Sequence, residues 1–155
     1  MANWPRVWRL TWAERWLLVQ ALFLLPLTAL ILWAVGFRRW QALLARLAPV
    51  GSVSASEDEA DLVREGRATA RLVDAAARRS PYTATCLPRS LTLWWLLRRR
   101  GIDSYLRIGV RKAAGRIEAH AWVELQGLVL DDDCDVSKRF AAFDRRFLSV
   151  EKIPQ

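Results

Sequence analysis

The first 48 residues of this 155-residue chain are far more apolar than the residues that follow. No charged residue occurs between Trp16 and Phe37, and a helix over that stretch would be roughly 30 Å long. Trp4, Trp8, Trp12 and Trp16 recur every four residues, a spacing that places their rings along one side of a helix. The pattern therefore predicts an apolar helical segment over residues 1–48.

Three interpretations of this segment stay open. A helix of roughly 30 Å matches the hydrocarbon core of a bilayer and would span it. A helical hairpin or an interfacial helix, bent at Pro26, would instead rest on a membrane surface. An apolar helix that packs on the rest of the chain or on a partner protein needs no lipid. Arginines flank the apolar run on both sides, so the charge pattern sets no orientation.

Residues 49–56 are rich in serine, with one proline and one glycine, and are the expected linker. A helix is predicted over about 57–79, because Ser56 and Glu59 fit a capping box and acidic residues crowd the first turn. The sequence Ser-Pro-Tyr at 80–82 ends this helix. Its expected buried face consists of Leu62, Val63, Ala70, Val73 and Ala77.

A second helix is predicted from Cys86 to Arg100, with Gly101 as its C-terminal cap and Pro88 tolerated in its first turn. Large apolar side chains predict a central position for it: Leu91, Trp94, Trp95 and Leu96. Strands are predicted over about 105–111, 117–125 and 128–131, with residues 126–127 as the last turn, followed by a short helix over 136–148. Helices followed by an antiparallel sheet indicate an α+β domain over residues 57–155.

Composition and charge narrow the class of protein. The chain is 53% hydrophobic, enough for a packed core, and its formal charge of +8 favours acidic partners such as an acidic peptide or a membrane surface. Its basic residues show neither zinc-finger spacing nor an aromatic RNA-binding signature, so no nucleic-acid partner is expected. Two cysteines are too few for a disulfide scaffold and favour a reducing, cytoplasmic compartment. Association with a membrane through the apolar segment is left open.

The candidate chemistry lies in the second half of the chain. Cys86 begins a predicted helix, His120 is the only histidine and lies in a predicted strand, and residues 131–133 are three aspartates at the end of the next strand. Unpaired N–H groups at a helix N-terminus stabilise a thiolate and serve as an oxyanion hole. An imidazole acts as base toward the thiol and then as acid toward the leaving amine, and a carboxylate fixes its tautomer. These parts are typical of cysteine hydrolases and acyl-transferases.

The choice of aspartate depends on strand register. A two-residue turn places Asp131 and Asp133 on the face of His120, whereas a three-residue turn places Asp132 there. Taken singly, each part has a plainer explanation: a packed cysteine, a buried histidine or a solvated acidic turn. The conjunction of the three favours catalysis. Cys134 lies in an acidic stretch that disfavours a thiolate, and one histidine with two distant cysteines predicts no metal site.

The chain resembles the B protein of lasso-peptide biosynthesis at three motifs: CLPRS at 86–90, IGV at 108–110 and HAWVE at 120–124. Members of this family are transglutaminase-like cysteine proteases that remove the leader from a ribosomally made lasso-peptide precursor, and the resemblance covers roughly residues 55–135. It implies Cys86 as nucleophile, His120 as base and Asp132, twelve residues beyond the histidine, as the third member of the triad. Arg89, Arg107 and Arg111 are candidates for contact with an acidic leader, and solvated arginines are the alternative.

In this family the protease is either fused to a winged-helix-like leader-recognition domain or separate from it. The first 50 residues here are too short and too apolar for such a domain, so the resemblance implies the separate protease half. It implies three partners, namely the leader-recognition protein, the precursor peptide and an ATP-dependent macrolactam synthetase, and it implies no cofactor for proteolysis. A transglutaminase-like acyl-transferase and a non-enzymatic, membrane-associated scaffold are the alternatives.

Overall fold

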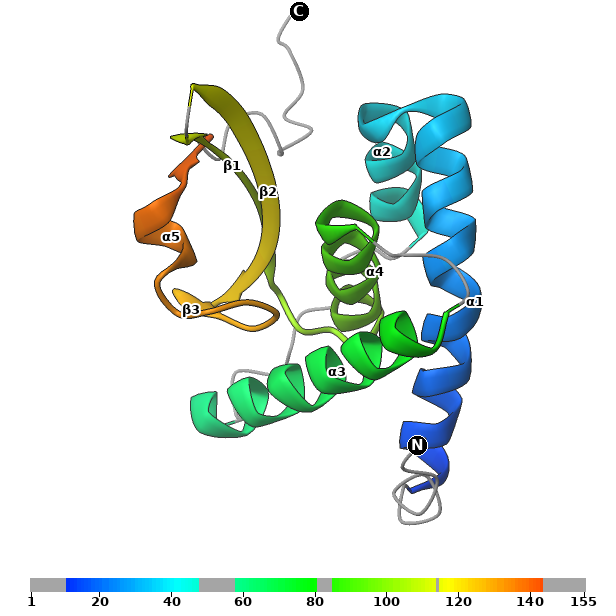
Figure 1. Ribbon diagram of the computed structural model, residues 1–155. Coiled ribbons are helices and arrows are strands. Elements are labelled where there is room, and N and C mark those ends of the chain that lie inside the picture. The colour runs from blue at the N-terminus through cyan, green and yellow to red at the C-terminus, as the bar shows by residue number, and fades with distance from the viewer. Residues whose placement is uncertain (1–10, 48–57, 81–84, 114, 144–155) are drawn as a thin grey trace, which may run out of the picture.

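A computed structural model describes residues 11–47, 58–80, 85–113 and 115–143 (Figure 1). Helices form one side of the molecule and a curled antiparallel sheet forms the other, as expected for an α+β domain. The elements in chain order are α1 (Trp12–Val35), α2 (Phe37–Leu47), α3 (Glu59–Arg79), α4 (Cys86–Arg99), β1 (Tyr105–Ala113), β2 (Arg116–Leu125), β3 (Leu128–Val129), α5 (Val136–Arg139) and β4 (Ala141–Ala142).

The apolar segment forms a helical hairpin that turns at Gly36. Thr11 and Glu14 make a capping box at the start of α1, and the helix then continues through Pro26. The hairpin therefore turns at Gly36, not at Pro26 as the hairpin interpretation had it. Pro26 is exposed, whereas Leu25 and Thr28 are buried on the inner side of the helix. This packing compensates for the backbone hydrogen bond that proline lacks. Gly36 has φ +84, a backbone conformation that favours glycine, and α2 begins directly after it.

The hydrophobic core is built around α4, which lies between α1 and the sheet (Figure 1). Its most buried side chains are Leu91, Leu93, Leu96 and Leu97. Residues of α1, α2 and α3 belong to the same cluster, as do Val123 and Leu125 of β2. The expected buried face of α3 is confirmed at Ala70 and Val73 and is partly buried at Leu62, Val63 and Ala77.

The sheet has the strand order β3-β2-β1-β4. Gly109 of β1 pairs with His120 of β2 on one side and with Ala142 of β4 on the other. A Cβ atom at position 109 would lie 2.9 Å from the ring of Trp122 and 3.0 Å from the carbonyl oxygen of Ala141. The absence of a side chain at Gly109 therefore lets the Trp122 ring and β4 approach the middle of the sheet.

The helix predicted over 136–148 is wrong. The described part of this stretch forms the single turn α5 and then β4, which pairs with β1. Val136 and Phe140 are buried with Trp122, and this packing draws the chain back onto the sheet. Residues 144–148 of the predicted helix lie outside the described residues.

The turn between β2 and β3 has two residues, as predicted. Gln126 and Gly127 both have positive φ, which is typical of a tight hairpin, and Leu125 pairs with Leu128. However, β3 ends at Val129, two residues earlier than expected. The division into residues 1–48, 49–56 and 57–155 stays a prediction, and its linker, with Trp4, Trp8 and Ser56, lies outside the described residues.

Candidate active site

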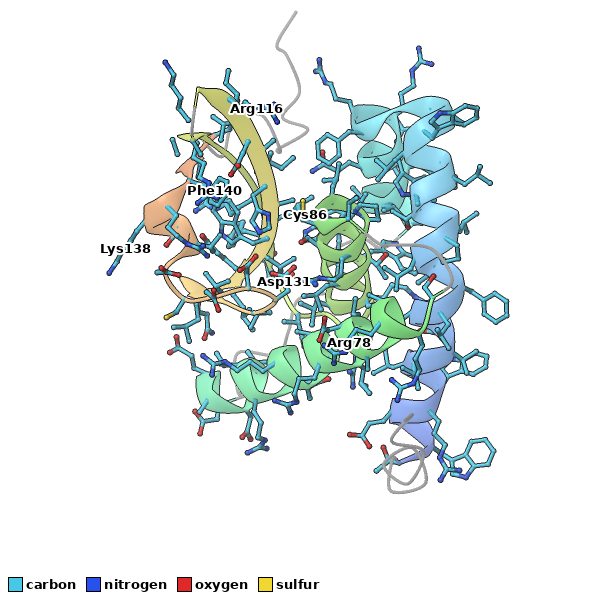
Figure 2. All side chains as sticks on the ribbon, in the orientation of Figure 1. Arg78, Cys86, Arg116, Asp131, Lys138 and Phe140 are labelled. Carbon is cyan, nitrogen blue, oxygen red and sulfur yellow. The ribbon has the colours of Figure 1, made fainter. Side chains whose placement is uncertain are left out.

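Cys86 is the first residue of α4 and is half-buried. Figure 2 shows it at the end of α4, on the side toward the sheet. Thr85 is the N-cap, and its side chain makes no capping hydrogen bond. Pro88 has no N–H, so the first-turn amides of Cys86 and Leu87 supply the donors at the positive end of this helix dipole. The thiol thus lies where a developing negative charge is stabilised.

Ser90 lies one turn after Cys86 on the same side of α4 and is 1% exposed. Its Oγ is 3.0 Å from the carbonyl oxygen of Ala121, which directly follows His120, and 2.6 Å from Oδ2 of Asp131. Because α4 and β2 run in the same direction (Figure 1), Cys86 and His120 lie at the same end of the contact between these two elements.

His120 is held by a hydrogen bond from Nε2 to Oδ2 of Asp132. Its ring stacks on Phe140 with 5.1 Å between ring centroids, and on Trp122 with 6.4 Å. The carboxylate accepts, so Nε2 carries the proton of the neutral ring and Nδ1 keeps its lone pair. This tautomer is the one that lets Nδ1 act as a base toward a thiol.

Asp132 is ionised although it is half-buried. Burial disfavours its charged form, but the hydrogen bond from His120, the N–H of Asp133 at 2.7 Å and the charges of His120 and Arg89 outweigh that effect. Together they hold the pKa of Asp132 below its ordinary value. An ionised Asp132 orients the imidazole and stabilises an imidazolium.

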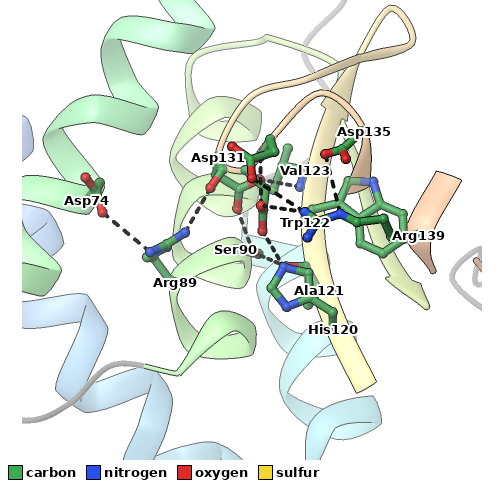
Figure 3. Close-up of polar contacts among 12 residues, drawn as sticks. Asp74, Arg89, Ser90, His120, Ala121, Trp122, Val123, Asp131, Asp135 and Arg139 are labelled. Atoms are coloured by element: carbon green, nitrogen blue, oxygen red, sulfur yellow. Dashed lines mark hydrogen bonds and ion pairs between the residues drawn. The ribbon is translucent and has the colours of Figure 1, made fainter. Parts of the chain in front are cut away.

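Asp131, its neighbour, has the opposite environment. Burial raises the pKa of Asp131, and the hydrogen bonds from Ser90 and from the N–H of Val123 at 2.8 Å only partly offset that rise. Its carbonyl oxygen accepts a hydrogen bond from Arg89 at 2.8 Å, and Arg89 also lies 3.4 Å from Asp74 of α3 (Figure 3). Asp131 therefore ties the loop after β3 to α4 and β2, while Asp132 reaches the histidine.

Strand register left the choice of aspartate open, and the resemblance implied Asp132. A two-residue turn was expected to place Asp131 and Asp133 on the face of His120, and the structure has that turn. Because β3 ends at Val129, the chain bends after it and strand alternation no longer governs residues 131–133. Asp133 is exposed, and its carboxylate lies 3.6 Å from Arg139.

A pocket of about 510 Å³ opens beside His120 and Asp132. Its other walls include Arg111, Glu118, Arg139 and Phe140. Arg111 is 2.6 Å from Glu118 and stacks 4.8 Å above the ring of Phe140. Sequence reasoning missed Glu118, Arg139 and Phe140, although Glu118 could have been found because it lies two residues before His120 on the same strand face.

The arginines named from the sequence have different surroundings. Arg89 is bound to Asp131 and Asp74, and Arg107 is 2.9 Å from Glu124 in a nearly buried ion pair. Both therefore stabilise the fold in this structure. Arg111 is the one of the three that lines the pocket.

The structure thus brings His120 and Asp132 together and places Cys86 at the same end of the α4–β2 contact. Among the described residues, no hydrogen bond joins the Cys86 thiol to His120. Cys134 is exposed, and the described ranges contain no cluster of three or more His, Cys, Asp or Glu side chains that could hold a metal.

A comparison with known protein families matches residues 31–144 to the Transglutaminase-like superfamily. The chain belongs to this superfamily. Comparisons with curated proteins and with solved structures gave no significant match. The transglutaminase-like superfamily includes cysteine peptidases and acyltransferases, and its members are typically enzymes. The match begins within α1, so the end of that helix and all of α2 fall inside the transglutaminase-like region.

Proposed function

We propose that this transglutaminase-like protein is a cysteine peptidase that removes the leader from a lasso-peptide precursor. The hydrogen bond between His120 of β2 and Asp132 is the observation that carries the peptidase reaction, and α4, which begins at Cys86, packs beside this strand. The motifs at 86–90, 108–110 and 120–124 support the choice of substrate through their resemblance to the lasso-peptide B proteins.

The reaction would proceed in two stages. His120 takes the thiol proton of Cys86 at Nδ1, and the thiolate attacks the carbonyl carbon of the scissile peptide bond. The amides at the start of α4 stabilise the oxyanion. The C–N bond breaks as His120 returns the proton to the leaving amine, and the acyl group stays on Cys86 as a thioester.

A water molecule then completes the cycle. His120 removes a proton from the water, which attacks the thioester carbonyl, and the C–S bond breaks to give a carboxylic acid and the free thiol. Asp132, ionised beside the ring, stabilises the imidazolium in both stages. The products would be the leader with a new carboxyl end and the core peptide with a free N-terminus.

The proposed partners are a separate leader-recognition protein, the precursor peptide and a macrolactam synthetase. Residues 12–47 form two helices that pack on α3 and α4, so this stretch contributes to the core of the protease. If the recognition protein holds the leader, the effective concentration of the scissile bond near Cys86 is high without strong binding by this chain. We place the reaction in the cytoplasm, where the ATP that ring closure uses is available.

The test is a mass-spectrometric cleavage assay with the purified protein, the recognition protein and the precursor. Scission at one junction should be lost in Cys86→Ala and His120→Ala and retained in the matched control Cys134→Ala. An added amine distinguishes the acyl-transferase alternative, because transfer gives an amide product of different mass. Cleavage that survives Cys86→Ala, or products that are mainly amides, would refute the proposal.

A further inference from the structure

The outer face of α1 is a continuous apolar surface. We define it as the large exposed side chains along this helix: Trp12, Trp16, Val19, Phe23, Leu27, Leu30 and Trp33. Their spacing of three or four residues places most of them along one side of the helix. Trp12 and Trp33 are each 86% exposed and Phe23 is 72% exposed. Figure 1 shows α1 at the edge of the molecule, with α3 and α4 on its inner side.

The inner side of α1 is already occupied by the protein itself. Leu18, Ala21, Leu25 and Thr28 are buried and belong to, or pack with, the core formed with α3 and α4. Length and composition alone would let α1 cross a membrane. A crossing would also carry α3 and α4, which pack on α1, toward hydrocarbon, together with the charged side chains of α3. Charged groups are costly there, so this packing disfavours a spanning orientation.

The chemistry of the outer face matches lipid better than protein. Its side chains carry no hydrogen-bonding group apart from the indole N–H groups of Trp12, Trp16 and Trp33, which lie toward its two ends. The polar residues of the helix interior lie elsewhere, since Thr28 is buried and Gln20 is half-buried. Protein interfaces carry roughly one hydrogen bond per 100–200 Å² and a polar rim, whereas acyl chains require none and tryptophan favours the bilayer interface.

Exposed basic residues follow this face along the chain, in α2. Arg38 and Arg39 are exposed in the first turn of α2, just beyond Trp33, and Arg46 is exposed in its last turn. Within the described residues these three arginines form no ion pair, whereas Arg64 is paired with Asp61. The whole chain carries a formal charge of +8. Unpaired arginines beside an apolar surface complement anionic lipid headgroups.

We propose that the outer face of α1 binds the surface of an anionic lipid bilayer, with the helix axis parallel to the membrane plane. In this orientation α4 separates the membrane from the sheet, so the pocket beside His120 stays open to a peptide in solution (Figure 1). The proposal does not depend on the proposed peptidase function.

The test is co-sedimentation of the full chain with vesicles of phosphatidylcholine, with and without phosphatidylglycerol. The wild-type protein should bind the anionic vesicles, and the double variant Phe23→Glu, Leu30→Glu should bind them about tenfold more weakly or worse. Both side chains are exposed, so the variant should keep its circular dichroism spectrum and its melting temperature. Ile117→Glu is the matched control, because Ile117 is apolar and 79% exposed but lies on β2.

A second pair of variants tests the charge contribution. The double variant Arg38→Gln, Arg39→Gln should lose part of the preference for phosphatidylglycerol, while Arg64→Gln should not. Three results would overturn the proposal: no vesicle binding by the folded wild-type protein, equal binding by the glutamate variant, or a dimer in lipid-free solution that the glutamate variant dissociates. The last result would show that a second copy covers the face.

Discussion

Two regions of the molecule differ in polarity: the site where α4, β2 and the loop after β3 meet, and the outer face of α1. At the site, polar side chains are hydrogen-bonded, Ser90 to Ala121 and Asp131, and His120 to Asp132. On the outer face, large apolar side chains are exposed. The apolar body of α4 lies between them. The difference indicates that the proposed peptide cleavage and the proposed membrane binding use separate parts of one fold. Variants should therefore affect cleavage and membrane binding independently.

The largest expected effect is the loss of catalysis in Cys86→Ala. Without a nucleophile no thioester forms, and cleavage should fall by about 10⁴-fold or more in a quantitative mass-spectrometric assay. Vesicle binding should be unchanged, since Cys86 lies on the sheet side of α4. Parallel loss of both properties in a folded variant would break the separation of the two regions.

Neighbouring aspartates should differ strongly in their effect on rate. Asp132→Asn removes the charge that orients His120, and cleavage should fall by about 10²-fold or more. Asp131→Asn keeps a side chain that accepts from Val123 and donates to Ser90, so it should reduce cleavage by less than about tenfold. Equal losses at comparable melting temperatures would contradict the distinct roles of these two side chains.

A cavity between the two regions should weaken the fold that carries both. Leu91 is fully buried in the core of α4, and Leu91→Ala should lower the free energy of unfolding by about 2–5 kcal/mol. Leu43→Ala is the control, because Leu43 is exposed on α2 and its truncation should cost less than about 0.5 kcal/mol. Urea unfolding measures both values, and similar losses in the two variants would argue against the packing described for α4.

The smallest effects should be opposite pH trends at Asp131 and Asp132. The raised pKa of Asp131 favours its protonated form in the folded state, so wild-type protein should gain stability relative to Asp131→Asn as the pH falls from 7 toward about 4. The lowered pKa of Asp132 stabilises the fold at neutral pH, and this advantage over Asp132→Asn should disappear as the pH falls below about 4. Urea unfolding across this range distinguishes the two, and trends of the same sign would contradict the assigned environments.

Local patterns sufficed to predict much of this fold. The C-terminal ends of α3 and α4 followed from helix-breaking residues, and the long strands followed from alternation, whereas α3 begins at Glu59 after the N-cap Asp58 and not at the predicted capping box. β4 was missed because a two-residue strand exists only through its pairing with β1 and the burial of Phe140. Cys86 and His120 were named from their places at a helix start and on a strand, and Asp132 was named from the resemblance. The contact of Asp132 with His120 depends on a bend after Val129 that strand register does not describe.

The most direct measurement of the central claim is the rate of iodoacetamide alkylation at Cys86 at neutral pH, followed by peptide mapping, with the exposed Cys134 as an internal reference. If His120 activates the thiol, Cys86 should react faster than Cys134 although it is less exposed, and His120→Ala should abolish that advantage. Reaction of Cys86 at or below the rate of Cys134, or an advantage that survives His120→Ala in a folded variant, would contradict the account.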